Sequence, residues 1–227
     1  MAGVRVAIDG PVAAGKSTVA RALARRLSFR YLDTGAMYRA LAWASQAQGI
    51  GPSDETGVRD LLAHFDLKVE LAPGGDCRIA VDGRDITTDI RTQAIGELAS
   101  ALSALPFVRE WMVRRQQALA AAGDIVAEGR DIQTVVIPDA EVKIFLTASE
   151  HERADRNQRD RQRTGESADA ATVLAELRRR DTRDSTRAHA PLRAAPDAVT
   201  LDSTGLTVED VVERIAELVQ QRERTKT

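Results

Sequence analysis

A glycine-bounded loop near the N-terminus, GPVAAGKS from Gly10 to Ser17, contains a single lysine. It fits the spacing G-x-x-x-x-G-K-[ST], in which backbone N–H groups and the positive end of the following helix surround the phosphates of a nucleoside triphosphate. Lys16 is expected to reach the β- and γ-phosphates, and the hydroxyl of Ser17 is expected to bind Mg²⁺. The residues predicted to bind the triphosphate are Gly10, Pro11, Val12, Ala13, Ala14, Gly15, Lys16, Ser17 and Thr18.

Two further segments follow predicted strands and carry charged side chains. In AEGRD, Glu128 is a candidate ligand of Mg²⁺, directly or through water, and Arg130 is a cation beside it. In LDTGAMYRA, a helix capped by Asp33 or Thr34 carries Arg39 in its second turn, as a candidate phosphate clamp. A local ion pair and a solvated arginine are the alternative interpretations of these two segments.

Arginine is concentrated in two polar segments nearer the C-terminus. In RRRDTRDSTR, Arg180, Asp184 and Arg187 are spaced i, i+4 and i+7, which predicts that they share one face of a helix. The stretch at 152–163 adds five arginines. A charged, solvated helix face is the alternative interpretation. Because two polyanionic substrates repel each other, arginines from several segments, joined to one phosphate loop, favour an anionic acceptor for a transferred phosphoryl group.

The composition is ordinary for a folded protein of 227 residues, with 43% hydrophobic and 29% charged residues. No apolar run approaches the roughly 18–20 residues of a membrane span, and the first residues lack the pattern of a signal peptide. One cysteine excludes an internal disulfide, so we expect a cytoplasmic setting. The net charge of −2 argues against a nucleic-acid-binding polycation. The 28 arginines against four lysines also fit simple codon bias.

The elements that must position these residues alternate along the chain, which implies an α/β fold with a parallel sheet covered on both faces. Turn signals in APGGD and DG predict a small antiparallel meander at about 66–90. We interpret the meander and the arginine-rich helices as lobes inserted into one core, and expect a disordered tail at 222–227. The expected strands are 4–8, 29–33, 124–129, 142–147 and 198–203; the expected helices are 16–27, 35–48, 54–65, 92–104, 106–121, 149–163, 170–185 and 208–221.

The loop alone does not decide among a switch, a hydrolase and a transferase. A guanine-reading N/T-K-x-D segment is missing, and so is a long apolar strand ending in a carboxylate pair. The alternatives left open are a kinase acting on a neutral metabolite and a nucleotide-binding switch without acceptor chemistry. Nucleic-acid binding by the arginine-rich helices is a weaker alternative.

Five segments together closely resemble the bacterial cytidylate kinases: GPVAAGKST, LDTGAMYR, IRTQ…ASALSALPFVRE, EGRDIQTVVIPDAEVKIFLTAS and RRRDTRDSTRAHAPL. The resemblance runs from about residue 4 to residue 220. It implies transfer of the γ-phosphoryl group of ATP to CMP or dCMP with Mg²⁺, giving ADP and CDP or dCDP. It also implies a monomer whose partners are small molecules, with neither nucleic acid nor membrane among them.

The resemblance further implies a P-loop NTPase core with a five-stranded parallel sheet flanked by helices, a monophosphate-binding lobe that contains the meander, and a helical lid. Residues 1–227 would then form one kinase domain. The core would comprise 1–33, 122–148 and 188–227, the monophosphate-binding lobe 34–121, and the lid with its flanking helix 149–187.

Site residues follow from the resemblance position by position. Thr34 would lie near the cytosine amino group, Tyr38 would wall the base pocket, and Arg109 would read the ring. Asp131 would accept a hydrogen bond from the exocyclic amine. The remaining ligands would be Arg39 and Arg187 for phosphate, Arg130 for base and phosphate, Ser100, Arg180 and Asp184 for the sugar, and Arg156 of the lid for ATP. Lys16, Arg130 and Arg187 would be the catalytic cations.

The chemistry of the bases supports this assignment. Cytosine presents an amino donor at position 4 and acceptors at N3 and O2, which match a carboxylate at Asp131 and a guanidinium at Arg109. Uracil presents a carbonyl opposite Asp131, and a mismatched buried polar group costs about 1–3 kcal/mol, or roughly tenfold to a hundredfold in selectivity. The phosphate oxygen that attacks is already ionised, so a general base is not required.

Two positions depart from the family pattern. Gln133 stands where the family usually has glycine, and its side chain is expected to crowd the monophosphate pocket or to restrict its loop. Ile137 stands where phenylalanine is frequent, which is a mild core change.

Overall fold

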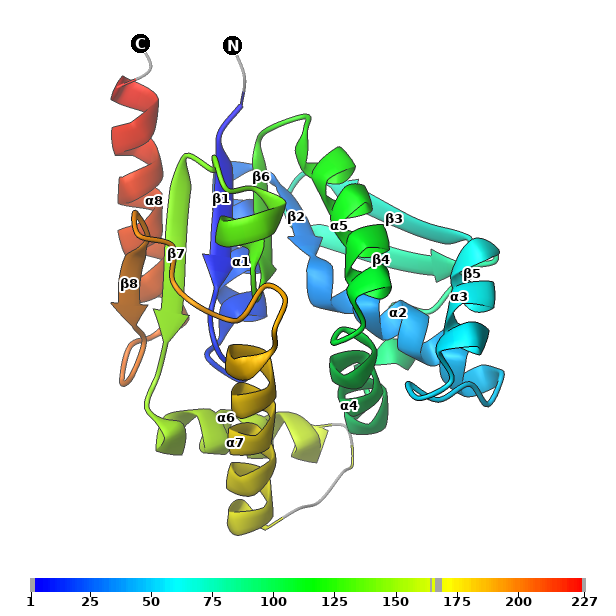
Figure 1. The fold of residues 1–227 in the computed structure, drawn as a ribbon. Helices are drawn as coiled ribbons and strands as arrows, with labels where there is room; N and C mark the ends of the chain where they lie inside the picture. The colour runs from blue at the N-terminus through cyan, green and yellow to red at the C-terminus, as the bar shows by residue number, and fades with distance from the viewer. Residues whose placement is uncertain (1–2, 164, 166–168, 226–227) are drawn as a thin grey trace.

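The computed structural model describes residues 3–163, 165 and 169–225, and its centre is a five-stranded parallel sheet (Figure 1). The strand order is β2-β6-β1-β7-β8. The strands are β1 (Arg5–Asp9), β2 (Arg30–Asp33), β6 (Ile125–Gly129), β7 (Val142–Thr147) and β8 (Val199–Asp202). The predicted α/β core is confirmed, with each expected strand shifted by no more than a residue at either end.

Register brings the polar ends of three strands to one edge of the sheet. Asp33 of β2 is opposite Glu128 of β6, and Asp9 of β1 is opposite Gly129. Between Arg5 and Asp9, the residues Val6, Ala7 and Ile8 are apolar and fully buried, so Asp9 is the one polar residue at the carboxyl end of β1. In open parallel sheets this edge is where ligands bind.

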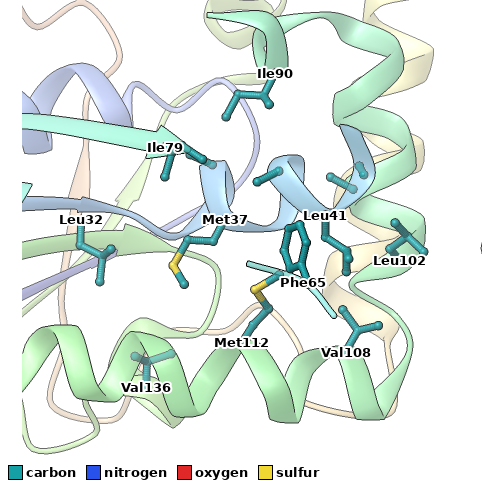
Figure 2. Close-up of a cluster of buried hydrophobic side chains, with 14 of the residues drawn as sticks. Leu32, Met37, Leu41, Phe65, Ile79, Ile90, Leu102, Val108, Met112 and Val136 are labelled. Carbon is teal, nitrogen blue, oxygen red and sulfur yellow. The ribbon is translucent and has the colours of Figure 1, made fainter. Parts of the chain in front are cut away.

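Each face of the sheet is covered by its own apolar cluster. On one face, α1 (Lys16–Leu27) and α8 (Val208–Thr225) bury Leu23 and Ile215 against Val6 and Ile144. On the other face, α2 (Thr34–Ala47) and α5 (Pro106–Ala120) pack over the sheet. Figure 2 shows part of this second cluster, in which Met37, Leu41, Phe65 and Met112 converge.

The segment between α2 and α5 builds a lobe whose core is continuous with that second cluster. It comprises α3 (Glu55–Ala63), β3 (Leu67–Ala72), β4 (Asp76–Val81), β5 (Arg84–Asp85), the short helix η1 (Asp89–Arg91) and α4 (Gln93–Leu102). The three strands pair antiparallel, which confirms the predicted meander. Ile79 of β4 and Ile90 of η1 are fully buried in the shared cluster (Figure 2).

Two polar helices, α6 (Glu150–Arg163) and α7 (Ala170–Thr186), lie beyond the carboxyl ends of the strands (Figure 1). They pack against each other, and their small apolar cluster includes Val12 and Ala13 of the phosphate loop with Ala154, Val173 and Leu177. The sequence segment at their junction falls partly outside the described residues, at 164 and 166–168.

Two local predictions need correction. Helix α8 continues to Thr225, so the tail predicted to be disordered is helical over 222–225, while 226 and 227 lie outside the described residues. The segment after β6 forms a π-helical turn, η2 (Ile132–Val136), which the sequence pattern did not predict. Within the described residues, no helix combines the length and the apolar character that crossing a membrane requires.

Candidate active site

A cavity of about 840 Å³ opens at the carboxyl ends of β1, β2 and β6 and extends to α4, α6 and α7. Its wall contains every residue that the sequence predicted to touch nucleotide or metal, except Gly10 and Pro11. The fold therefore brings together segments that are far apart in the chain, from Val12 in the loop to Val211 in α8.

The two glycines of the phosphate loop have distinct reasons to be glycine. A Cβ on Gly10 would lie 2.0 Å from the carbonyl oxygen of Leu146, so β7 leaves no room for a side chain. Gly15 adopts φ +91° as the N-cap of α1, a conformation that residues with a Cβ rarely adopt. Gly10 therefore lets the start of the loop pack directly against the backbone of β7. Gly15 turns the chain so that the N-terminus of α1 faces the cavity.

Lys16 is folded back onto the loop. Its Nζ donates to the carbonyl oxygen of Pro11 at 2.7 Å, and only 5% of the residue is exposed. Burial, followed by the nearby charge of Arg130, lowers the pKa of Lys16 to about 7. A polyphosphate in the cavity would supply the negative charge that favours the ammonium form.

Oxygen ligands suited to a magnesium ion lie beside the loop. The hydroxyl of Ser17 donates to Oε1 of Glu128 at 2.6 Å, and the hydroxyl of Tyr31 donates to the same atom at 3.3 Å. Burial, followed by the charge of the neighbouring Asp33, raises the pKa of Glu128, and a cation beside it would favour its ionised form. No group of three or more His, Cys, Asp or Glu side chains fit for a metal occurs among the described residues. Ser17 and Glu128 therefore fit Mg²⁺ that keeps waters and phosphate oxygens as its other ligands.

The phosphate loop is held from outside by α6 and α7. The amide of Val12 donates to Oδ1 of Asp181 at 3.2 Å, and Arg153 binds both the Val12 carbonyl and Oδ2 of Asp181. Arg156 donates to the Ala14 carbonyl at 3.2 Å. Sequence reasoning found Arg156 but missed Arg153 and Asp181, because a charged residue in a polar helix gives no local sign of a distant backbone partner.

Across the cavity, Asp131 is the centre of a buried ion-pair cluster. Its Oδ2 accepts from Nη2 of Arg109, and its Oδ1 lies 3.7 Å from Nη2 of Arg187. The Arg109 guanidinium lies 6.0 Å from the centre of the Tyr38 ring. Thr34 is also in this wall, where its hydroxyl donates to the Glu128 carbonyl at 2.7 Å.

Arg130 and Asp184 form a second pair in the same wall, with Nε of Arg130 donating to Oδ2 of Asp184 at 2.8 Å. Helix α7 ends at Thr186, so Arg187 is not on the helical face predicted for it; its backbone is extended, and its side chain turns toward Asp131. Arg180 and Asp184 do share the buried face of α7. Nε of Arg180 and Nη2 of Arg187 are buried without a hydrogen-bond partner in the described part of the chain. Their nearest carboxylate oxygens, on Glu97 at 3.8 Å and on Asp131 at 3.7 Å, are beyond hydrogen-bond distance, so both donors can still hydrogen-bond a ligand.

Arg39 is oriented by backbone carbonyls of the lobe. Its Nη1 donates to the carbonyls of Ile90 and Thr92 at 2.9 and 3.0 Å. Burial, followed by the nearby Arg180, lowers the pKa of Arg39 to about 10, which is still high enough to keep it charged at neutral pH. Arg91 in the IRTQ segment also lines the cavity and pairs with Asp33 at 2.8 Å; sequence reasoning assigned it no role.

Two predicted residues have partners that the sequence did not indicate. Ser100 lines the cavity, but its hydroxyl accepts from Nη1 of Arg183 at 2.8 Å. The expectation that Gln133 crowds the pocket is wrong, because its side chain is buried away from the cavity. It donates to the Ile144 carbonyl and accepts from the amide of Ala195 at 3.0 Å. Gln133 instead fixes its own turn to β7 and to the segment before β8.

A phosphate loop facing a second, arginine-lined compartment defines a P-loop kinase with an anionic acceptor. The family model for cytidylate kinase matches residues 6–221. A cytidylate kinase of Geobacillus kaustophilus is 49% identical, over 96% of this chain and 97% of that protein. The chain belongs to the cytidylate kinase family, and it is an ATP-dependent nucleoside monophosphate kinase.

One further relative agrees with the family, and one solved structure shares the fold. A bifunctional pantoate ligase/cytidylate kinase of Synechococcus elongatus is 48% identical over 96% of this chain, which spans 42% of that longer protein. An uncharacterized protein of Eubacterium ventriosum has a crystal structure with the same fold, at a TM-score of 0.52 and 12% identity, covering 96% of this chain and 98% of that one.

Proposed function

We propose that this cavity transfers the γ-phosphoryl group of ATP to CMP or dCMP, giving ADP and CDP or dCDP. The observation that supports it most is the buried Arg109–Asp131 pair beside donors of Arg180 and Arg187 that make ion-pair contacts but no hydrogen bond, in the same cavity as Lys16. A neutral acceptor would not need such a concentration of buried guanidinium groups. Membership of the cytidylate kinase family supports the choice of acceptor.

ATP would bind at the phosphate loop, with its β- and γ-phosphates over the N-terminus of α1. Lys16 would leave the Pro11 carbonyl for the phosphates, because a phosphate oxygen is a stronger partner for an ammonium group than a carbonyl. Arg156 already contacts the Ala14 carbonyl and would approach the nucleotide from α6. Mg²⁺, when bound beside Ser17 and Glu128, would neutralise charge on the transferring group.

Asp131 and Arg109 would read the base together. The cytosine amino group would donate to the Asp131 carboxylate, and N3 and O2 would accept from Arg109. Both side chains are less than 10% exposed, so the mismatch with uracil is not relieved by water. Tyr38 would form the wall of the base pocket and Thr34 would lie near the amino group.

The acceptor's phosphate would lie among Arg39, Arg130 and Arg187, whose internal partners are carbonyls and carboxylates that substrate oxygens replace. Arg180, Asp184 and Ser100 would hold the sugar. Catalysis would consist of alignment and charge neutralisation, because the attacking phosphate oxygen is ionised at neutral pH. In this scheme Lys16, Arg130 and Arg187 stabilise the transferring phosphoryl group.

The division into a core, a monophosphate-binding lobe and a lid is part of the same proposal. The lobe at 34–121 would carry CMP, and the lid at 149–187 would enclose ATP. A monomer and a cytoplasmic setting stay predictions from the sequence.

The test is ADP formation from MgATP with CMP, UMP, AMP and GMP in parallel. We expect the rate of ADP formation with CMP to exceed the rate with UMP by at least about tenfold. Faster turnover with UMP or AMP would overturn the base assignment. Equal, slow turnover with every monophosphate would indicate a nucleotide switch. If Arg39→Ala left acceptor affinity intact, the acceptor would be a neutral metabolite.

A further inference from the structure

The turn that follows Asp131 is capped in an unusual way. Asp131 is the N-cap residue of η2, and its carbonyl oxygen accepts from the amides of Val135 and Val136 at 2.9 and 3.2 Å. An aspartate at this position usually turns its carboxylate back to accept from the first amides of the turn. Asp131 makes no such bond, because its carboxylate points into the cavity toward Arg109 and Arg187.

Asp9 supplies the missing cap from another strand. Its Oδ1 accepts from the amide of Ile132 at 3.0 Å, and its Oδ2 accepts from the amide of Gln133 at 2.9 Å. Each carboxylate oxygen thus satisfies one of the first two N–H groups of η2, and Asp9 is fully buried. The bonds span more than 120 residues of sequence, so this cap depends on the sheet rather than on the turn itself.

The position of Asp9 links the two sides of the cavity. Asp9 is the last residue of β1 and directly precedes Gly10, the first residue of the phosphate loop. Its register partner in β6 is Gly129, two residues before Asp131. The carboxylate therefore extends from the strand that leads into the ATP loop to the turn that carries the proposed base-reading residue.

We propose that Asp9 is a positioning residue for base selection: by capping η2 in place of Asp131, it leaves the Asp131 carboxylate free to read the cytosine amino group. This inference rests on the proposed function, in which Asp131 is the base-reading group. Without Asp9, the first amides of η2 would lack an acceptor, and the nearest carboxylate able to reach them would be that of Asp131. The turn itself would remain anchored through Gln133 to Ile144 and Ala195.

The experiment compares Asp9→Asn with Asp131→Asn in the full-length enzyme, measuring kcat and KM for CMP and UMP and the KM for ATP. Asparagine keeps the shape of aspartate but offers one acceptor oxygen, so one amide of η2 loses its partner. We expect Asp9→Asn to lower the CMP-to-UMP ratio of kcat/KM by about tenfold, mainly through a higher KM for CMP. The KM for ATP is expected to stay within about threefold. Asp131→Asn should lower the same ratio at least as much.

Failure of the proposed function and failure of the inference about Asp9 give different results. If the wild-type enzyme does not prefer CMP, or if Asp131→Asn keeps the preference, the proposed function fails in its base assignment. If Asp131→Asn relaxes the preference while Asp9→Asn slows CMP and UMP equally, Asp9 has only a structural role and the inference is overturned. The double variant adds a check: its CMP-to-UMP ratio should equal that of Asp131→Asn alone, because Asp9 acts through Asp131.

If Asp9→Asn does not fold, Asp9→Ser is used in its place. A serine hydroxyl is smaller and can still accept one hydrogen bond from an N–H group. The same drop in the CMP-to-UMP ratio is expected. Failure of both variants to fold would assign Asp9 to stability and overturn the inference.

Discussion

The two sides of the cavity achieve binding in different ways. The donor side is the phosphate loop, residues 10–18, with Glu128. Its groups are backbone amides, the ammonium of Lys16, the hydroxyls of Ser17 and Thr18, and the Glu128 carboxylate. The acceptor side is the wall that carries Arg39, Arg109, Arg130, Asp131 and Arg187. There Arg109 and Arg187 pair with Asp131, Arg130 pairs with Asp184, and Arg39 donates to backbone carbonyls.

The difference shows what each side requires of a ligand. Apart from Glu128, the donor-side groups lie close together in sequence, and Asp181 and Arg153 hold the loop through the backbone of Val12. On the acceptor side the guanidinium groups are compensated internally, with Arg109 and Arg187 on Asp131 and Arg130 on Asp184. A nucleotide there exchanges one set of ionic partners for another, which favours specificity over raw affinity.

The largest effect is expected on the donor side. Lys16→Ala should lower kcat by about a thousandfold, because it removes the cation nearest the transferring phosphoryl group in a water-poor site. The fold should persist, since Lys16 makes its one hydrogen bond to its own loop. Steady-state kinetics with MgATP and CMP measure the loss, and circular dichroism checks the fold. Near-normal turnover would refute the role given to the loop.

A hundredfold effect is expected for one acceptor-side cation. Arg187→Ala should raise the KM for CMP by about a hundredfold, since a buried, charge-assisted donor is lost, and should change the KM for ATP little. Arg193→Ala is the matched control, because Arg193 lies on the next segment, is exposed and does not line the cavity. Equal changes in the KM for ATP and for CMP would remove the distinction between the two sides.

A pH-dependent effect is expected where the two sides meet. Burial raises the pKa of Asp9 to about 6, although the hydrogen bonds from the Gln133 and Ile132 amides act to lower this pKa. The contribution of Asp9 to stability is therefore present below pH 3.8 and is lost as the pH rises through 6. The free energy of unfolding of the wild type relative to Asp9→Asn should fall by about 2 kcal/mol between pH 4 and pH 7. Urea unfolding across that range measures it; a constant difference would contradict the burial of a charged carboxylate.

The smallest effect is expected for Gln133→Gly. Its side chain bonds to the Ile144 carbonyl and the Ala195 amide, away from the cavity, so the KM for CMP should change by less than about threefold. Stability should fall by about 1–2 kcal/mol, because two buried polar groups lose their partners. Chemical unfolding and CMP kinetics of the same variant check both statements. A large fall in the KM for CMP would restore the idea that Gln133 crowds the pocket.

Much of the donor side was predictable from the sequence because its determinants are local. The spacing from Gly10 to Ser17, the apolar run before it and the amphipathic helix after it together predict strand, loop and helix. The pattern of charged residues already pointed to Arg39, Arg130, Arg180, Asp184 and Arg187. The family resemblance added Thr34, Tyr38, Ser100, Arg109 and Asp131, and all ten line the cavity.

Partners across the fold could not be predicted. Asp181 binds the Val12 amide, and Asp9 caps the Ile132 and Gln133 amides. Both contacts depend on how distant segments pack together, which the type of a side chain does not reveal. The prediction that Arg180, Asp184 and Arg187 share one helical face was wrong for Arg187, because α7 ends at Thr186. Pairing of arginines with internal carboxylates likewise follows only from the packed structure.

The most direct test of the contrast between the two sides is equilibrium binding of CMP and of cytidine to the wild-type enzyme and to Arg39→Ala. The acceptor-side arginines are proposed to hold the phosphate, so CMP should bind the wild type at least about a hundredfold more tightly than cytidine. Arg39→Ala should weaken CMP about tenfold or more and leave cytidine unchanged. Equal affinities of the wild type for CMP and cytidine would contradict the account.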